Sequence, residues 1–253
     1  MSSIVFYGRP GTGKSTLAAS FTKLGYHVHF IDVDRKVKSM RNLQPLLENG
    51  SVSYEEIDAP LVEGKLRGRV IQLPKAPVIM PKGYVRIAEL MDRHAENPLP
   101  NAHKTVLVLD SMTAVNGHLK RLIKNLSKKS KLSFDEWDAI LVNYEELFGC
   151  FFALQPSIYA HCVVIAHAKD EKDEVLGDIE AKPLLDGQMR DKLGSLVEEM
   201  YWTYVDATKS GPAKFRVLTK PVGRVSQARS SFAVNTVMDA DMSIIFQGER
   251  APE

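Results

Sequence analysis

A glycine-rich stretch near the start of the chain carries the residues with the clearest chemistry. The sequence GRPGTGKS, from Gly8 to Ser15, fits the pattern G-x-x-x-x-G-K-[ST]. Gly8, Gly11 and Gly13 allow backbone turns that a Cβ would block, so that the loop can wrap its N–H groups round an anion. Lys14 is placed to reach β- and γ-phosphates, and the Ser15 hydroxyl to ligate Mg²⁺. The stretch therefore predicts a site for the phosphates of a nucleotide.

The surroundings of this stretch are those that such a loop requires. The apolar run IVFY at 4–7 predicts a strand before it, and STLAASFTKLG at 15–25 predicts a helix after it. A helix start there adds the positive end of its dipole to the anion site. We expect the nucleotide to be held by the loop and the first helical turn, namely Gly8, Arg9, Pro10, Gly11, Thr12, Gly13, Lys14, Ser15 and Thr16.

A second acid is delivered by another apolar run. TVLVLD at 105–110 predicts a buried strand that ends in Asp110. Open α/β sheets bind ligands at the carboxyl ends of their strands. An acid at that place can hold Mg²⁺ across from Ser15, and we expect these two residues to form the metal site.

The elements that position these residues alternate between strand and helix patterns. Further strands are predicted at 26–34, 162–167, 201–206 and 214–220, and helices at 83–96 and 134–154. Alternation of this kind predicts an α/β fold with a mostly parallel sheet flanked by helices. The last two strands predict an antiparallel hairpin at the sheet edge, joined by a turn around Gly211 and Pro212. No linker divides the chain, which favours a single domain over residues 1–253.

The helix at 134–154 has the sharpest local signals. Ser133 and Glu136 fit a capping box at its start. Apolar residues then recur at helical spacing, which is typical of a core-facing stripe. The predicted core residues are Phe134, Trp137, Ile140, Leu141, Tyr144, Leu147, Phe148 and Phe151.

Three stretches of the chain resemble the RecA superfamily of ATPases. VLVLDSMTAV is similar to its second ATP motif, in which a strand ends in Asp-Ser, and FIDVD to the strand that carries its catalytic acid. This resemblance implies that Asp34 activates the attacking water, with Asp32 as the alternative. VVIAHAKDE resembles the strand with a γ-phosphate sensor, which implies that role for His167. The fold implied is a RecA-like P-loop NTPase core.

Taken over its length, the chain is most similar to the phage RecA-like single-strand annealing ATPases of the Sak type. That resemblance implies ATP and Mg²⁺ as cofactors and DNA-stimulated ATP hydrolysis in recombination. It implies single-stranded DNA, other copies in a ring or filament, and a single-strand-binding protein as partners. The compartment implied is the cytoplasm of a phage-infected bacterium. A basic residue of the next subunit commonly completes such sites, and Arg229 and Arg224 are the candidates.

A basic run follows the Asp110 strand. HLKRLIKNLSKKSK at 118–131 has six basic residues and no acid, with an apolar stripe on another face. A basic amphipathic helix of this kind can follow a DNA backbone without reading sequence, although a solvated charged face is the ordinary alternative. The candidate DNA contacts are Lys120, Arg121, Lys124, Lys128, Lys129 and Lys131.

Two other function classes stay open. A small-molecule phosphotransferase would need a lid with arginines, for which Arg67, Arg69 and Arg86 are available. An ATP-gated assembly factor would bind ATP and a protein. The charge-dense segment 168–188 predicts a mobile loop, at the place of the family's second DNA loop.

The amino-acid composition excludes some classes of protein. The chain is 44% hydrophobic and 25% charged with a net charge of +2, which is ordinary for a globular protein and excludes a polycation. No leader or membrane span is evident, so we expect a cytoplasmic protein with no membrane partner. Cys150 and Cys162 are expected to be buried free thiols. His27 and His29 share a strand face with no further ligand nearby in sequence, and are expected to pack.

Overall fold

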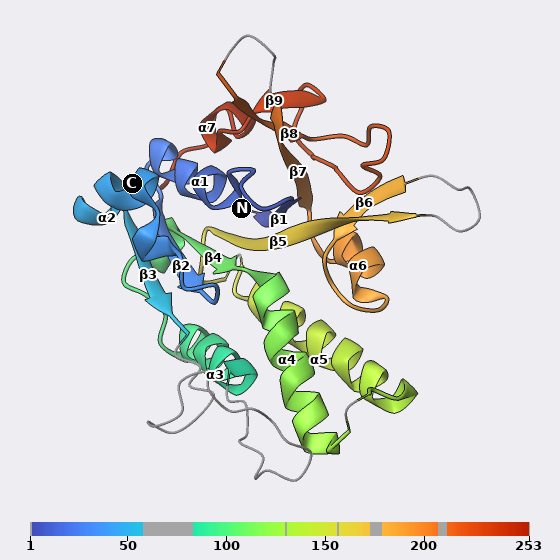
Figure 1. The fold of residues 1–253 in the computed structure, drawn as a ribbon. Helices are drawn as coiled ribbons and strands as arrows, with labels where there is room; N and C mark the ends of the chain where they lie inside the picture. Colours follow the sequence, from blue (N-terminus) through green and yellow to red (C-terminus); the bar gives the residue numbers. More distant parts are fainter. Residues whose placement is uncertain are drawn as a thin grey trace.

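The computed structural model describes residues 2–57, 83–129, 131–155, 157–172, 179–206 and 212–252. Its described residues form a nine-stranded sheet whose main path runs β3-β2-β4-β5-β1-β7-β8-β9 (Figure 1). The first six strands of this path are parallel. They are β3 (Val52–Glu56), β2 (His27–Asp32), β4 (Thr105–Asp110), β5 (His161–Lys172), β1 (Ser2–Gly8) and β7 (Glu199–Asp206).

The antiparallel strands lie on the carboxyl-terminal side. β8 (Lys214–Leu218) pairs with β7, and β9 (Val237–Asp239) pairs with β8. β6 (Ile179–Pro183) pairs with the outer half of β5, off the main path. The prediction of a mostly parallel α/β sheet with a late antiparallel hairpin is therefore confirmed. Gly211, in the predicted turn of that hairpin, lies outside the described residues.

Helices cover both faces of the sheet (Figure 1). One face carries α3 (Gly83–Glu96), α4 (Met112–Ser127) and α5 (Phe134–Ala153). The other carries α1 (Lys14–Ala19), α2 (Gln44–Glu48) and α7 (Met242–Ile245). The short helix α6 (Met189–Lys192) lies beside β6. Single 3₁₀ turns lie at Ser20–Leu24, Val37–Ser39, Arg41–Leu43, Ala102–Lys104 and Leu193–Leu196.

The structure has two hydrophobic cores, one on each face of the sheet, because side chains along the central strands alternate between the two faces. In β1, Val5 and Tyr7 belong to the core under α3, α4 and α5, whereas Ile4 and Phe6 belong to the core under α1 and α7. Successive side chains of a strand point to opposite faces, so a strand covered on both sides reads as an uninterrupted apolar run. The strands that position Gly8 and Asp110 are therefore held from both sides.

The segment 168–188 is not the loop that its charge density predicted. β5 continues to Lys172 and pairs in register with β6, with residues 173–178 outside the described part. Several of the charges among its described residues are paired within the hairpin and its surroundings. Arg190 pairs with Glu171 at 2.5 Å, and Lys182 with Glu180 and Asp191 at 3.0 Å each. In sequence, a charge-dense hairpin is hard to tell from a loop, because the sequence does not show which charged side chains pair.

After β2, the described residues up to 57 form two 3₁₀ turns, the helix α2 and the edge strand β3, and the sequence analysis predicted no strand there. β2 ends at Asp32, so Asp34 lies beyond the strand rather than on its face. Arg67 and Arg69, two of the arginines available for a lid, lie outside the described residues.

The capping box of α5 is confirmed, because the Ser133 N–H donates to the Glu136 carboxylate at 2.6 Å. Ile140, Tyr144, Leu147, Phe148 and Phe151 are buried as predicted, and Leu141 packs against the same core.

The first turns of α5 differ from the prediction. Phe134 is 87% exposed and Trp137 38% exposed. α4 and α5 extend together away from the sheet at that end (Figure 1), so the early aromatic residues have no sheet to pack on. Cys150 is exposed, contrary to expectation, whereas Cys162 is buried; both are free.

Within the described part of the chain, no helix is long and apolar enough to span a bilayer.

Candidate nucleotide-binding site

The loop between β1 and α1 has the backbone that its glycines predict. Gly11 and Gly13 have φ of +78° and +82°, in the left-handed region. A Cβ on Gly8 would lie 2.3 Å from Thr203 Oγ1, on the neighbouring strand β7. Thr12 Oγ1 fixes the loop through hydrogen bonds to Thr203 Oγ1 at 2.7 Å and to a loop carbonyl at 2.8 Å. The loop is thus anchored to β7 as well as to its own strand.

Lys14 lies inside this loop. Its ammonium is buried and donates to the carbonyls of Gly8 at 3.0 Å and Arg9 at 2.8 Å. Burial lowers the pKa of Lys14 to about 8, and the nearby Asp110 and Asp34 carboxylates oppose that shift. A partly desolvated cation held among backbone groups is the arrangement that a polyphosphate binds.

Ser15 and Asp110 meet at the carboxyl end of β4. The Ser15 hydroxyl donates to Asp110 Oδ2 at 2.6 Å, although the two residues come from distant parts of the chain. Asp110 is buried, and burial raises its pKa to about 6 despite the Ser15 hydrogen bond. A hydroxyl and a carboxylate oxygen are ligands that Mg²⁺ prefers, and a divalent ion would offset the cost of burying this charge. The residues present therefore fit the ion.

The two candidate bases lie in different environments. Asp32 is fully buried, and its Oδ2 accepts from the Val37 N–H at 2.8 Å, which is a turn-stabilising contact. Burial raises the pKa of Asp32. Asp34 lines the same cavity as Lys14, and its Oδ2 accepts from the Ser111 hydroxyl at 3.2 Å. The geometry favours Asp34 as the residue that faces a bound nucleotide.

Asp34 is poised as an ionised carboxylate. Burial acts to raise its pKa, but the His167 imidazole, the Lys36 ammonium and the Ser111 hydroxyl outweigh burial and hold the pKa below its usual value. His167 Nε2 lies 3.8 Å from Asp34 Oδ2, and Lys36 Nζ lies 3.6 Å from it. An acid that stays ionised can accept a proton from water at neutral pH.

His167 also connects the site to a helix. Its backbone N–H donates to Thr113 Oγ1 at 2.9 Å, in the first turn of α4. Its side chain lines the same cavity as Asp34 and Lys14. A change at this strand end therefore acts directly on the start of α4.

These side chains surround a cavity of about 560 Å³, a size that suits a nucleotide. Of the predicted site residues, the cavity is lined by Pro10, Gly11, Gly13, Lys14, Ser15, Thr16, Asp34, Asp110 and His167. Gly8, Arg9 and Thr12 belong to the loop without lining the cavity. Sequence reasoning missed the lining residues Lys36, Met40, Asn42, Ile165, Phe215 and Ala240.

The missed residues carried little signal in sequence. Phe215 comes from β8, and its ring would lie 3.0 Å from a Cβ on Gly13. Asn42 donates from its amide to Thr16 Oγ1 at 2.6 Å. Neither belongs to a motif, and only the folded arrangement brings them to the loop.

The late arginines lie in two places. Arg229 pairs through its backbone with Met200, near the start of β7, while the phosphate loop lies at the carboxyl end of the parallel strand β1. It is exposed and does not line the cavity of its own chain. Arg224 Nη1 lies 3.2 Å from Asp170, and the same carboxylate binds Arg9 of the loop at 2.5 Å.

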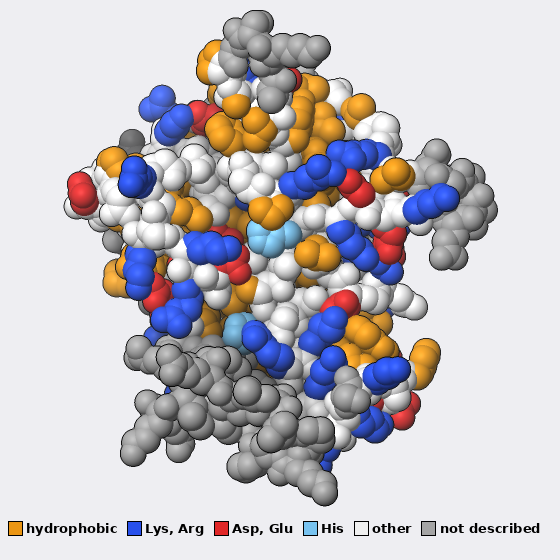
Figure 2. Space-filling model, viewed as in Figure 1, with side chains coloured by type: hydrophobic (Ala, Val, Ile, Leu, Met, Phe, Trp, Pro, Cys, Tyr) orange, Lys and Arg blue, Asp and Glu red, His pale blue; other side chains and the backbone are white. Residues whose placement is uncertain are grey.

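The basic run forms the second half of α4 and the turn after it. Figure 2 shows Lys and Arg side chains gathered over the part of this face where α4 lies in Figure 1. Lys120 is half-buried, with Asp186 at 2.9 Å and the Trp137 ring centroid at 5.1 Å, and Lys129 pairs with Glu136 at 2.7 Å. Within the described ranges, four of the exposed cations have no acidic partner, namely Arg121, Lys124, Lys128 and Lys131.

Comparison with known proteins agrees with this site. A family model described as an AAA domain matches residues 2–231, nearly the whole chain. No curated protein matches the chain significantly. The family match indicates a P-loop ATPase of the AAA type, and such ATPases generally bind ATP with Mg²⁺. It says nothing about the narrower phage family, so that resemblance stays a prediction. The chain belongs to the AAA domain family.

Proposed function

We propose that this protein hydrolyses ATP and binds single-stranded DNA, with each ligand affecting the other, in strand annealing or recombination. The observation that carries the ATPase part is the 2.6 Å contact between Ser15 and Asp110 beside the phosphate loop, with Asp34 on the same cavity. The basic face of α4 and the resemblance to phage annealing ATPases support the DNA part.

The chain's own residues divide the work of hydrolysis. Lys14 and the loop N–H groups bind the phosphates, and Ser15 and Asp110 would hold Mg²⁺, which neutralises phosphate charge when bound. Asp34 orients water for attack on the γ-phosphorus and takes its proton as the bond to the β-phosphate oxygen breaks. His167 lies 3.8 Å from Asp34 and lines the same cavity, which supports the proposal that it senses the γ-phosphate.

The DNA contact lies at the far part of the helix that starts at the site. α4 begins directly after Asp110 and Ser111 and is bonded to His167 through Thr113. Its exposed cations suit a sugar–phosphate backbone, which they would bind without sequence preference. Lys120 and Lys129 contribute less in this proposal, because each has an acidic partner.

The test is an ATPase assay titrated with single-stranded DNA, together with DNA binding measured over a range of salt. Lys14→Ala should abolish hydrolysis. Lys124→Ala with Lys128→Asn should weaken DNA binding and reduce the slope of log K against log salt by up to about 1.4. Asparagine suits position 128, whose φ is +54°. The matched control is Lys220→Ala with Arg250→Ala, which removes two exposed charges elsewhere.

An unchanged salt slope in the α4 variant would contradict the assigned DNA face. ATP turnover that is indifferent to DNA but matched by a phosphorylated small acceptor would replace the proposal with a phosphotransferase. ATP-dependent capture of a protein with no DNA affinity would replace it with an assembly factor.

A further inference from the structure

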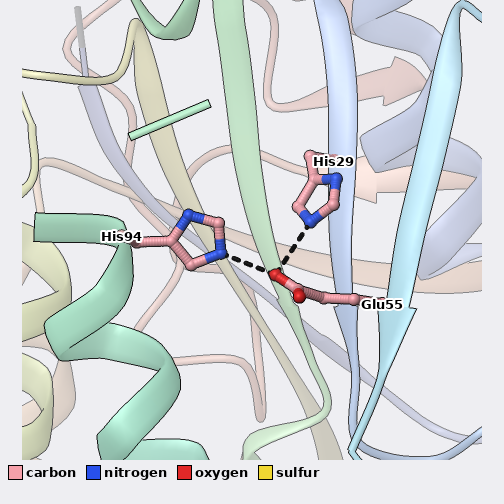
Figure 3. Close-up of side chains that lie close together, drawn as sticks. All are labelled: His29, Glu55 and His94. Atoms are coloured by element: carbon pink, nitrogen blue, oxygen red, sulfur yellow. Dashed lines mark hydrogen bonds and ion pairs between the residues drawn. The ribbon is translucent and has the colours of Figure 1, made fainter. Parts of the chain in front are cut away.

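Two histidines and a glutamate converge at the edge of the sheet, away from the nucleotide cavity (Figure 3). They are His29 of β2, Glu55 of β3 and His94 near the end of α3. Glu55 Oε1 lies 2.8 Å from His94 Nε2 and 3.2 Å from His29 Nε2, and one atom from each residue lies within 4.8 Å of the others. None of the three lines the cavity at the phosphate loop.

We propose that these three side chains form a site for a divalent transition-metal ion of the Zn²⁺ class, which ties α3 to β2 and β3. The proposal gives His29 a role beyond the packing that the sequence analysis expected. Two imidazole nitrogens and a carboxylate oxygen are a common ligand set for Zn²⁺, with a fourth position left to water. Tetrahedral bonds of Zn²⁺ length place neighbouring donors about 3.3 Å apart. The separations of 2.8 Å and 3.2 Å from Glu55 Oε1 lie within about 0.5 Å of that value, so small side-chain adjustments suffice.

The Nδ1 atom of each histidine ring already has a hydrogen-bond partner. His29 Nδ1 lies 2.7 Å from the Ser53 hydroxyl, and His94 Nδ1 lies 2.7 Å from the Tyr159 hydroxyl. Tyr159 is itself fixed, because its oxygen accepts from the Leu99 N–H at 3.1 Å. Metal-binding histidines are almost always oriented by such a partner on the second nitrogen. Both rings therefore present Nε2 toward the same point.

The hydrogen atoms can be placed consistently with and without an ion. Without one, His29 Nε2–H donates to Glu55, and Nδ1 accepts from the Ser53 hydroxyl. With one, Nε2 binds the ion, and Nδ1–H donates to Ser53, whose hydrogen turns to His27 Nε2 at 2.7 Å. The ring changes tautomer but not charge, so neutral histidine serves in both states.

The carboxylate has a free side for the ion. Glu55 Oε2 accepts from Arg93, which leaves Oε1 to bind in a monodentate manner. The His94 and His29 side chains are only 2% and 7% exposed, whereas Glu55 is 27% exposed. An ion would thus be reached from the Glu55 side and would be backed by two buried rings. It would join three elements that are distant in sequence and would stabilise α3 on the edge strand.

The test uses the full chain without a histidine tag, in a Cys150→Ser background, because the exposed thiol is an alternative ligand. After chelation and dialysis, Co²⁺ is titrated and its visible absorption followed, and then Zn²⁺ is added as competitor. We expect one Co²⁺ per chain with the strong bands of a four-coordinate ion, bleached by Zn²⁺. His94→Gln and Glu55→Gln should each remove the bands, and Tyr159→Phe should weaken binding by about 10–100-fold.

The matched control is His103→Gln, an exposed histidine outside the cluster and its hydrogen-bond network, and it should keep the bands. Asp110→Ala should also keep them, because the proposed magnesium site is separate. Circular dichroism checks that each variant is folded. Absence of Co²⁺ bands in the Cys150→Ser protein would overturn the proposal and leave a hydrogen-bonded network around Glu55. Binding that survives in both His94→Gln and Glu55→Gln would overturn it as well.

Discussion

At the scale of single residues, two aspartates close together in sequence have opposite surroundings. Asp32 is fully buried and caps the turn that follows β2, whereas Asp34 lies on the nucleotide cavity beside His167 and Lys36. The sequence alone left these two residues as alternatives for the catalytic base, because both suit a short acidic motif. The geometry favours Asp34, because its carboxylate contacts the Ser111 hydroxyl and lines the cavity.

We predict that Asp34→Asn lowers the ATPase rate by about 10²–10⁴-fold while ATP affinity changes little, because the amide cannot accept the proton of water. Asp32→Asn is the matched control. It keeps an oxygen for the Val37 N–H, and we expect it to retain most of the activity. The measurements are steady-state ATP hydrolysis and equilibrium nucleotide binding. Loss of activity in Asp32→Asn with an active Asp34→Asn would reverse the assignment.

At the scale of elements, the start of β5 is held by a buried histidine. His161 is fully buried, and its Nδ1 accepts from the Ser2 N–H at 3.0 Å. Its ring packs against Phe21, Tyr26 and Phe246. Burial lowers the pKa of His161 from 6.5 to about 3. The Glu249 carboxylate lies 3.8 Å from His161 Nε2, beyond hydrogen-bonding distance.

This histidine makes stability depend on pH. Between pH 6.5 and about 3 the unfolded chain binds a proton that the folded chain does not, so stability present above pH 6.5 is lost as the pH falls. The contribution is up to about 1.4 kcal/mol per pH unit below 6.5. We expect His161→Phe, which keeps the ring packing, to show a shallower decline in urea unfolding as the pH is lowered. Equal slopes for the two proteins would show that His161 is not the responsible group.

The elements also show what the sequence could and could not predict. The phosphate loop and Asp110 were found because their signals are local: a glycine pattern and an apolar run that ends in an acid. The hairpin of β5 and β6 was missed because its charges find their partners only in three dimensions, as Lys182 does with Asp191. Glu55 and His94 were missed for the same reason, because no spacing rule connects a strand residue to a helix end.

At the scale of the whole molecule, one predicted site residue lies away from the cavity of its own chain. Arg229 pairs with Met200 near the amino-terminal end of β7, whereas the phosphate loop follows the carboxyl-terminal end of the neighbouring strand β1. A role for it in hydrolysis therefore requires a second copy of the chain, as the predicted ring or filament would provide. Arg224, by contrast, shares Asp170 with Arg9 and lies beside the loop of its own chain.

We predict that Arg229→Ala impairs hydrolysis without weakening ATP binding, because a finger from the next subunit stabilises charge that develops during transfer. Mixing Arg229→Ala with Lys14→Ala should restore activity, since an intact loop can then meet an intact arginine. An equivalent mixture of Arg224→Ala with Lys14→Ala is the comparison. A mixture no more active than the sum of its parts would exclude action of Arg229 between subunits.

The hydrogen bond from His167 to Thr113 has a mechanical consequence. This bond fixes the first turn of α4 to the end of β5. Since α4 has sixteen residues, its other end lies about 24 Å away. If α4 turned as a rigid rod about this first turn, a tilt of roughly 10° would displace its far end by about 4 Å. Lys124 and Lys128 lie at that far end of the helix. A sub-ångström adjustment around the γ-phosphate would in this way be amplified into a stroke comparable to the spacing between successive nucleotides.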